Sequence, residues 1–424
     1  MVGLCESNGH DCKLVDAEAE NLTHDQLLSI AKRFKPSFTV IYISEATEQD
    51  TDLAKRIKKE TKSKIIMVGP WCSMNYKEIL KSEAVDSVID GEFEFAVKDI
   101  VEGKLKKRFI TSKRLTQKQL DELSWVTKTY KKHLNIRNYK ISSLWYPFVD
   151  MFTGRRCYWG KCIFCLWPFT IQKDQGYTVR DIKDVLDEIG WVTKNMNVKE
   201  IFIQDDTLPG WRAKQLSEGI LQRGIKIRWS AYARGDLTMT PEILKLMKKS
   251  GCHCLHVGYE SGSNKLLKAI NKGVTRQDLE KFTKWVNDAK IDIHADFMIG
   301  LPGETEKTIR DTIDWAKKLN VMTYQFAPPR VYPCTPFYKW ARQKNYLNDN
   351  GIMNFPNMSI TEMESWSRTA LRECYFNFGF LKRVIFKPRE LERLMRSAFY
   401  MMSWMITKKA QIIGSENQNK GRCD

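Results

Sequence analysis

The sequence contains no apolar run long enough to span a bilayer, and its first ten residues lack the basic-then-apolar pattern of a secretory signal. It also contains no arginine–glycine–glycine tract, no zinc knuckle, no internal repeat and no low-complexity tract. These absences argue against a transmembrane segment and against specific nucleic-acid binding. We therefore expect a cytoplasmic protein, in a compartment where thiols stay reduced.

Composition sets further limits. A length of 424 residues allows two or three domains, and an apolar share of 42% is that of an ordinary globular protein. Eleven cysteines, an odd number, fit ligands and free thiols better than a set of intramolecular disulfides. The net charge of +18 suggests an anionic partner, but Lys and Arg are spread along the whole chain, so a solvated basic surface explains it equally well.

Three cysteines lie close together in the segment Cys157-Tyr-Trp-Gly-Lys-Cys162-Ile-Phe-Cys165. Three thiolates on one loop can hold three irons of a four-iron, four-sulfur (4Fe-4S) cluster and leave the fourth iron open for an external ligand. Neither Cys nor His follows within the next few turns, which argues against a zinc site closed by four protein ligands. Gly160 relieves backbone strain in the wider gap. Scattered thiols are the alternative, and the spacing favours the cluster.

The first part of the chain alternates short apolar runs with helical patterns. Strands are predicted at 38–44, 64–69 and 84–90, and helices at about 48–62, 75–82 and 93–102. This βαβ succession indicates a parallel, doubly wound sheet, in which ligands bind at the carboxyl ends of the strands.

The alternation resumes after about residue 147. Strands are predicted at 148–153, 199–205, 226–232, 254–259, 292–299 and 322–327, with helices at about 180–195, 211–223, 241–250, 275–289 and 304–319. Six βα units indicate a partial (β/α) barrel, whose active site gathers at the carboxyl ends of the strands. The cysteine segment directly follows the first of these strands.

These patterns predict an α/β protein with five segments. A Rossmann-like domain occupies 1–105, a basic linker 106–146 and the barrel 147–345. A helical subdomain rich in aromatic residues follows at 346–412, and a polar, disordered tail at 413–424. The linker is predicted to hold one short helix, around 116–124.

With the cysteine segment placed after the first barrel strand, the chain resembles the radical S-adenosylmethionine (SAM) enzymes, in the branch with an N-terminal cobalamin-binding domain. The resemblance covers about residues 10–345. The segments that carry it, besides the cysteine loop, are Ile203-Gln-Asp-Asp-Thr207, Val257-Gly-Tyr-Glu-Ser-Gly262 and Phe297-Met-Ile-Gly-Leu-Pro-Gly-Glu304. It implies a truncated Rossmann-like domain, a partial (β/α)6 TIM-like barrel and a C-terminal helical region.

The resemblance implies cofactors and roles. Cys157, Cys162 and Cys165 would ligate the 4Fe-4S cluster, which reduces SAM to a 5′-deoxyadenosyl radical with an electron from a donor such as flavodoxin or ferredoxin. The SAM-binding residues would be Phe164 at adenine, Gln204 and Asp205 at the ammonium group, Arg234 at the carboxylate, Glu260 at hydroxyl or ammonium groups, and Gly300 and Gly303 beside adenine. Each has a plainer reading: Asp205 could cap a helix, Arg234 could form a surface ion pair, and Gly303 could belong to a turn.

The N-terminal part resembles the cobalamin module through Leu14-Val-Asp-Ala-Glu-Ala-Glu20, Val68-Gly-Pro70 and Asp90-Gly-Glu-Phe-Glu94. Gly69, Trp71 and Glu92 are the candidate cobalamin-binding residues, and Trp71 could equally fill core. The sequence departs from the family pattern in two places. It begins where the first strand and its helix should already be complete, and it lacks an Asp-x-His-x-x-Gly segment.

The cysteine loop also departs from the family pattern, because its first gap holds four residues where three are usual. Cys334, in Tyr332-Pro-Cys-Thr-Pro336, could face the cavity and donate hydrogen or protons, although a free Cys is usually inert filler. Cys252, His253, Cys254 and His256 could suggest a metal site, but a buried strand fits them better.

The leading hypothesis is a cobalamin-dependent radical SAM methyltransferase that acts on an unactivated carbon. One alternative is an oxidative cyclase or rearrangement enzyme of the same branch, related to the anaerobic magnesium-protoporphyrin ester cyclases. A second is a non-catalytic, cluster-containing binding or regulatory protein. The basic charge and the aromatic C-terminal region suggest an anionic or lipid-like small-molecule substrate. Methylthiolation of tRNA is disfavoured, because the sequence shows no β-rich RNA-binding module at its C-terminal end.

Overall fold

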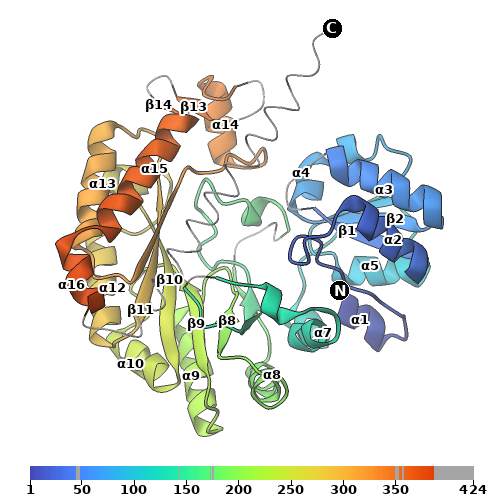
Figure 1. Ribbon diagram of the computed structural model, residues 1–424, viewed down its shortest axis with the longest axis horizontal. Coiled ribbons are helices and arrows are strands. Elements are labelled where there is room, and N and C mark those ends of the chain that lie inside the picture. Colours follow the sequence, from blue (N-terminus) through green and yellow to red (C-terminus); the bar gives the residue numbers. More distant parts are fainter. Residues whose placement is uncertain are drawn as a thin grey trace.

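The computed structural model describes residues 1–43, 48–141, 143–171, 173, 176–348, 353–355 and 358–385. Two parallel sheets, each with its own helices, lie side by side (Figure 1). Residues 386–412 of the predicted helical subdomain and the predicted tail lie outside the described residues. The α/β fold class is confirmed.

The first sheet has four parallel strands in chain order: β1 (Phe38–Tyr42), β2 (Lys64–Val68), β3 (Ser87–Asp90) and β4 (Phe109–Thr111). Its helices are α1 (Val2–Ser7), α2 (His24–Phe34), α3 (Glu48–Thr61), α4 (Pro70–Ile79) and α5 (Glu94–Val101). Alternate residues of β2 enter different cores: Ile65 packs with α2 and α3, whereas Ile66 packs with α5. Helices therefore cover both faces of this sheet, as a doubly wound fold requires.

The second sheet has six parallel strands in the order β12-β11-β10-β9-β8-β5 and remains open between its two edges. The strands are β5 (Phe148–Met151), β8 (Glu200–Ile203), β9 (Arg228–Ala233), β10 (Cys252–Glu260), β11 (Asp292–Met298) and β12 (Thr323–Ala327). The helices between them are α8 (Ile182–Asn195), α9 (Gly210–Gln222), α10 (Pro241–Lys249), α11 (Asn264–Ala269), α12 (Arg276–Asp288) and α13 (Glu306–Lys318). The sheet is the predicted partial barrel, and α11 is an addition to it.

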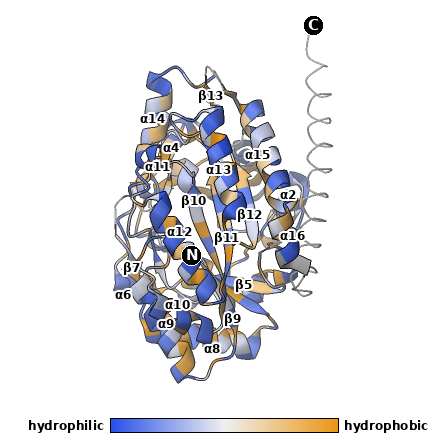
Figure 2. Cartoon of the chain, turned by 90° about the vertical axis from the view of Figure 1, so that its left-hand side faces the viewer, coloured by the Kyte–Doolittle hydropathy of each residue, from blue (hydrophilic) through white to orange (hydrophobic). Residues whose placement is uncertain are grey.

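The helices of this unit pack against one face of the sheet. Figure 2 looks onto that side, with α12 and α13 in front of β10 and β11. Alternate strand residues such as Ile201, Leu255 and Ile293 fill the core beneath these helices. The intervening residues, such as Asp150, Tyr232 and His294, point to the opposite side of the sheet, which we call the inner face.

The segment between the two sheets is more structured than the predicted linker. It contains β4, α6 (Gln117–Glu122), α7 (Val126–His133) and a short 3-10 turn at Ile136–Asn138. Its last part lies against the inner face near the amino ends of the strands, which we call the lower inner face. There Leu144 packs with Phe148 and Phe202, and the Trp145 N–H donates to Glu200 (2.6 Å). We propose a first-domain boundary beyond residue 111, because β4 pairs with β3.

The C-terminal part adds α14 (Pro336–Gln343), a small hairpin of β13 (Asn354–Phe355) and β14 (Met358–Ser359), α15 (Ile360–Tyr375) and α16 (Phe378–Ile385). Helix α15 begins with a capping box between Ser359 and Glu362 and packs beside β12 and α13. Among the described residues, no helix has both the length and the apolar character needed to cross a bilayer.

Candidate functional site at the carboxyl ends of the strands

The three-cysteine loop follows β5 and a two-residue hairpin strand, β6 (Gly154–Arg155), which pairs with β7 (Thr178–Val179). Cys157, Cys162 and Cys165 are free and half-buried. Burial, together with the neighbouring charges of Cys162, Asp206 and Cys157, raises the pKa of Cys165 to about 12. The three thiols therefore lie near one another, and a bound metal would be needed to hold Cys165 as a thiolate.

Among the described residues, no three His, Cys, Asp or Glu side chains converge closely enough to hold a single metal ion. A 4Fe-4S cluster places each cysteine on a different iron, so its ligands need not meet at one point. Gly160 has φ +60°, a conformation that glycine adopts without strain, and it lies in the wider gap between two of the cysteines. The loop thus fits a cluster held by three cysteines.

Asp205 anchors the start of this loop. Its carboxylate is buried and accepts hydrogen bonds from the Thr153 N–H (2.7 Å), the Thr153 hydroxyl (2.6 Å), the Gly154 N–H (3.1 Å) and the Tyr177 hydroxyl. Burial raises the pKa of Asp205, against the effect of these donors. Its partners are therefore protein groups at the base of the loop, and they differ from the SAM ammonium group that we predicted for it.

The neighbouring residues Gln204 and Asp206 remain accessible. The Gln204 side chain is exposed, while its backbone N–H donates to the Met151 carbonyl (2.7 Å). Asp206 accepts a hydrogen bond from the Arg156 backbone N–H (2.8 Å), next to Cys157. Asp206 was not among the predicted site residues, although it lies in the Ile203–Thr207 segment and could have been chosen from it.

Four charged residues join the first sheet to the loop, and we call them the interdomain clamp: Glu92, Glu94, Arg155 and Arg156. Arg156 is fully buried and donates to Glu92 (2.7 Å), while Arg155 contacts Glu92 (3.3 Å) and Glu94 (2.7 Å). Arg156 has φ +83°, an unfavourable conformation for a residue with a Cβ, and directly precedes Cys157. Glu92, a predicted cobalamin residue, thus contacts the arginines before the first cysteine.

Arg234 lies beside the cysteine loop at the end of β9. Its Nε donates to Asp236 (3.1 Å), and its guanidinium carbon lies 4.5 Å from the centre of the Trp159 ring. The side chain is buried, yet its Nη1 has no hydrogen-bond partner among the described residues. A buried guanidinium N–H without an acceptor costs roughly 1–3 kcal/mol. This geometry fits a carboxylate ligand, as predicted for SAM.

Glu260 forms a buried ion pair with Lys272 (2.8 Å) at the end of β10. Burial raises the pKa of Cys162, and the positive charge of Lys272 is the largest opposing effect, so the pair lies close to that cysteine. Glu260 has φ +62°. Lys272 was not predicted, because its position beside Glu260 depends on how residues 264–275 fold back over the strand end.

Phe164 packs partly against the main core, and the adjacent Ile163 backbone donates to the Ile270 carbonyl and accepts from the Phe337 N–H (both 3.1 Å). The same Phe337 contact brings the turn with Cys334 to the cysteine loop. Burial raises the pKa of Cys334 to about 11, so this thiol is neutral at physiological pH. The structure therefore places Phe164 and Cys334 in neighbouring segments of the site.

The two glycines after β11 have left-handed backbones, with φ +111° at Gly300 and +86° at Gly303. A Cβ at Gly300 would lie 2.5 Å from the Met363 sulfur, whereas one at Gly303 would meet nothing closer than 3.8 Å. Packing against α15 thus explains Gly300 without a ligand. Gly303 has open space beside it, which permits the close approach predicted for adenine.

Candidate cobalamin residues lie at the carboxyl edge of the first sheet. Gly69 has φ +113°, and a Cβ there would lie 2.5 Å from the Ile43 carbonyl oxygen, so the backbone itself requires glycine. Trp71, the second residue of α4, is half-buried, and its backbone N–H donates to the same carbonyl (3.3 Å). Four buried polar atoms near this edge have no hydrogen-bond partner among the described residues: Ser73 Oγ, Asn75 Nδ2, Asp90 Oδ1 and Ser112 Oγ.

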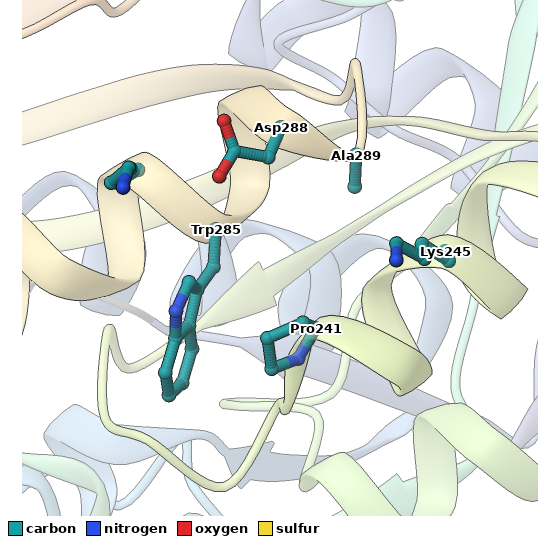
Figure 3. A pocket seen from close by; sticks show the side chains of 6 residues that line it. Pro241, Lys245, Trp285, Asp288 and Ala289 are labelled. Carbon is teal, nitrogen blue, oxygen red and sulfur yellow. The ribbon is translucent and has the colours of Figure 1, made fainter.

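A hollow of about 230 Å³ lies between the helices α10 and α12. Figure 3 shows Pro241, Lys245, Trp285, Asp288 and Ala289 around it, all from the outer helical layer. None of the predicted site residues lines this hollow. It is therefore distinct from the site described above.

Comparison with known proteins gives a family match within the second unit. Residues 151–316 match the family model of the radical SAM superfamily. An uncharacterized methyltransferase of Pyrococcus horikoshii is 28% identical over 415 residues, which cover 89% of this chain and 86% of the relative. The anaerobic magnesium-protoporphyrin IX monomethyl ester cyclase of Rubrivivax gelatinosus is 23% identical, with 93% of this chain and 76% of the relative covered.

Among solved structures, the radical SAM methyltransferase TsrM of Kitasatospora setae, with tryptophan and a SAM analogue bound, has a TM-score of 0.66. The two sequences are 16% identical, and the match covers 89% of this chain and 80% of TsrM. The likeness extends over both sheets, so the two proteins share a fold.

Proposed function

We propose that this chain, whose residues 151–316 form a radical SAM domain, is a cobalamin-dependent methyltransferase that acts on an unactivated carbon atom. Radical SAM enzymes use a 4Fe-4S cluster and SAM, and three free cysteines on one loop suit such a cluster. Methyltransferases occur both among the sequence relatives and among the structural neighbours. The proposal assigns cobalamin to the first sheet.

One observation carries the cobalamin assignment: the buried polar atoms without partners at the edge of the first sheet. They come from separate segments, since Asn75 lies in α4 after β2, Asp90 ends β3 and Ser112 follows β4. An unsatisfied buried polar group is costly, so a ligand with many amide groups would supply hydrogen bonds that this edge lacks. TsrM has also been solved with cobalamin and the cluster bound.

The positions of the residues at the carboxyl ends of the second sheet suggest a role for each of them. Cys157, Cys162 and Cys165 would hold the cluster, and the free N–H of Arg234 would bind the SAM carboxylate. Gln204, exposed at the end of β8, would accept a hydrogen bond from the ammonium group. When bound, the cluster supplies the electron that cleaves SAM, and methylcobalamin supplies the methyl group.

The interdomain clamp supports the same proposal. It fixes the loop after β3 against the residue that precedes Cys157, so the two carboxyl edges hold a defined separation. Methyl transfer between a group on one edge and a substrate activated at the other requires reacting atoms held in a fixed geometry. Arg155 bridges both carboxylates and Arg156 pairs with Glu92, and such a buried, charge-assisted network is suited to fixing such a geometry.

The second candidate is an oxidative cyclase, favoured by the match to the Rubrivivax cyclase over 93% of this chain. A non-catalytic, cluster-containing protein is the third. For either enzyme we also propose a flavodoxin or ferredoxin as electron donor and the cytoplasm as compartment.

The test is anaerobic reconstitution of the cluster followed by addition of hydroxocobalamin, SAM and reductant. S-adenosylhomocysteine together with 5′-deoxyadenosine supports methyl transfer, and deoxyadenosine alone supports the cyclase. Neither product, with the iron content intact, leaves the non-catalytic reading.

A binding experiment isolates the cobalamin assignment. Asn75→Ala should weaken hydroxocobalamin binding by roughly tenfold, the usual effect of losing one hydrogen bond to a buried group. Asn195→Ala, at the end of α8 and far from the first sheet along the chain, is the matched control and should bind like the parent. Equal affinities for the parent and both variants would count against the first sheet as the cobalamin site.

A further inference from the structure

Two rows of side chains cross the inner face of the second sheet. The strand registers align Tyr232 with His256, His256 with His294 and His294 with Thr323. The next inward-facing row, two residues nearer the carboxyl ends, contains Gly258, Asp296 and Gln325. Neighbouring strands lie about 4.8 Å apart, so the members of each row are in reach of one another.

Direct contacts link these rows. The rings of His256 and His294 have centroids 4.8 Å apart. His294 Nδ1 lies 2.8 Å from the Thr323 hydroxyl, and its Nε2 lies 3.3 Å from Asp296 Oδ1. At the other end, His256 Nε2 lies 3.3 Å from the Ser143 hydroxyl. A continuous polar chain therefore runs from Ser143 to Asp296.

The chain is closed at its lower end and open at its upper end. His256 is only 5% exposed, because residues 143–145 cover the lower inner face. The Asp296 side chain is 32% exposed, and Gln325 is exposed between the buried Tyr324 and Phe326. Arg234, the predicted SAM-carboxylate residue, is two positions beyond Tyr232 and is therefore level with Asp296, two strands away in the sheet.

The charge of this region opposes that of the whole chain. Burial raises the pKa of Tyr232 to about 12, and the carboxylates of Asp296, Asp150 and Asp206 add to the effect. Three acidic groups thus converge on one phenol, which stays a neutral donor at physiological pH. Two cations lie near the second row, Arg234 beyond Tyr232 and Lys272 beside Gly258, but they are paired with Asp236 and Glu260 respectively.

These features specify a binding preference. An ionised carboxylate offers about four acceptor positions, more than the single His294 nitrogen can use. Gln325 adds an amide oxygen beside it. A ligand that brings a cation or an N–H donor would be attracted, whereas an anionic ligand would meet like charges. The inner face therefore favours a different kind of substrate from the anionic one that the overall charge suggested.

We propose that Asp296 and Gln325, backed by His294 and Tyr232, bind a cationic or N–H-bearing nitrogen group of the substrate, and so place the carbon to be modified next to SAM. The substrate class is accordingly a nitrogen-containing small molecule. This inference rests on the proposed function, because it takes the SAM site to be active.

The test uses the cluster-reconstituted protein with SAM and without reductant, titrated by calorimetry with benzylammonium chloride or sodium benzoate as probes. We expect benzylammonium to bind with a dissociation constant in the millimolar range, as a small ligand allows, and benzoate to bind at least tenfold more weakly. Asp296→Asn should weaken benzylammonium binding about tenfold. Gln325→Glu, at an exposed position, should strengthen it severalfold. Asp288→Asn, at the outer hollow of Figure 3, is the matched control and should leave it unchanged.

If Asp296→Asn misfolds, the gain of benzylammonium binding expected for Gln325→Glu still tests the inference. Absence of saturable benzylammonium binding, equal binding of benzoate, or a Gln325→Glu protein that binds like the parent would overturn the inference. The proposed function is judged separately, from reductant-dependent 5′-deoxyadenosine formation by the unmodified protein. Probe binding needs no turnover, so either idea can fail without the other.

Discussion

The carboxyl edges of the two sheets offer their ligands different chemistry. The edge of the second sheet presents three thiols from one loop, with Arg234 and the Glu260–Lys272 pair around them. The edge of the first sheet presents hydroxyl, amide and carboxylate atoms scattered over α4, β3 and the residue after β4. A compact cofactor held by covalent metal bonds needs few ligands close in sequence. A large cofactor held by hydrogen bonds draws on groups that only the fold brings together.

Cys162→Ala should produce the largest effect and should separate the two edges. Because burial raises the pKa of Cys162, its thiolate depends on a bound metal, and two remaining cysteines would leave a second iron without a protein ligand. We expect loss of the iron–sulfur absorbance and of SAM cleavage, with hydroxocobalamin binding retained.

Cys12→Ala is the control for this experiment, since Cys12 lies at the N-terminal end, outside the cysteine loop. It should retain the absorbance and the deoxyadenosine yield. If Cys162→Ala kept a full complement of iron, the assignment of the loop as the cluster site would be wrong.

Arg156→Met tests how the clamp joins the edges. The substitution leaves buried Glu92 with the 3.3 Å contact to Arg155 and the hydrogen bond from the Leu115 N–H (2.5 Å), and breaking a buried ion pair typically costs roughly 3–5 kcal/mol. We expect a fall of that size in the free energy of unfolding, measured by anaerobic urea denaturation. Some of this loss would be offset by the removal of strain if the loop relaxes from φ +83°.

Arg223→Met provides the comparison, because Arg223 pairs with Asp187 (2.6 Å) at the surface, where both side chains are at least one-third exposed. Such pairs contribute about 0–1 kcal/mol. Equal losses for the two variants would show that the clamp behaves as an ordinary surface ion pair.

The sequence was most informative where function depends on neighbours in the chain. The strand pattern located the six strands of the second sheet, and β5 and β11, for example, begin at the residues expected, Phe148 and Asp292. The cysteine loop was recognised because its three thiols lie within one short segment. Cluster ligation itself, like every other site role, stays a prediction.

The rest depended on contacts between distant residues. Asp205 was expected at SAM, but its partners Thr153 and Gly154 lie more than 50 positions earlier, where no periodic pattern could reveal them. The segment 106–146 read as a linker because it lacks a regular apolar pattern. Its part in closing the lower inner face follows from Ser143, which contacts His256 across 113 positions.

Glu94 of the interdomain clamp makes the stability of the protein depend on pH. Burial alone would raise its pKa, but the charges of Arg155 and of the N-terminal ammonium group outweigh burial and lower it from 4.5 to about 2. A depressed pKa in the folded state adds stability above about pH 4.5, and that stability is lost as the pH falls toward 2. The shift corresponds to at most about 3 kcal/mol.

Glu94→Gln should therefore reduce the acid sensitivity of the protein. Urea unfolding at pH 7 and pH 3.5 should show a larger loss of stability for the parent than for the variant. Glu364→Gln, at an exposed position of α15, is the control and should change the difference little. The same loss in the parent and in Glu94→Gln would mean that the clamp is not ionised as described.

The smallest effect is expected from Gln204→Ala, which asks whether a SAM-binding role resides in the exposed residue or in its buried neighbour. Gln204 is joined to the sheet through its backbone N–H, so removing its side chain should leave the unfolding free energy unchanged within about 0.5 kcal/mol. One hydrogen bond to the charged ammonium group is worth about 1.5–3 kcal/mol, so the dissociation constant of SAM should rise at least tenfold. Asp205→Asn should instead lower the free energy of unfolding and leave SAM binding little changed, because it weakens the anchor of the loop at Thr153 and Tyr177. Calorimetric titration of SAM and urea unfolding on both variants make the measurement. If Asp205→Asn weakened SAM binding at unchanged stability while Gln204→Ala did nothing, the ammonium group would belong to the buried carboxylate after all.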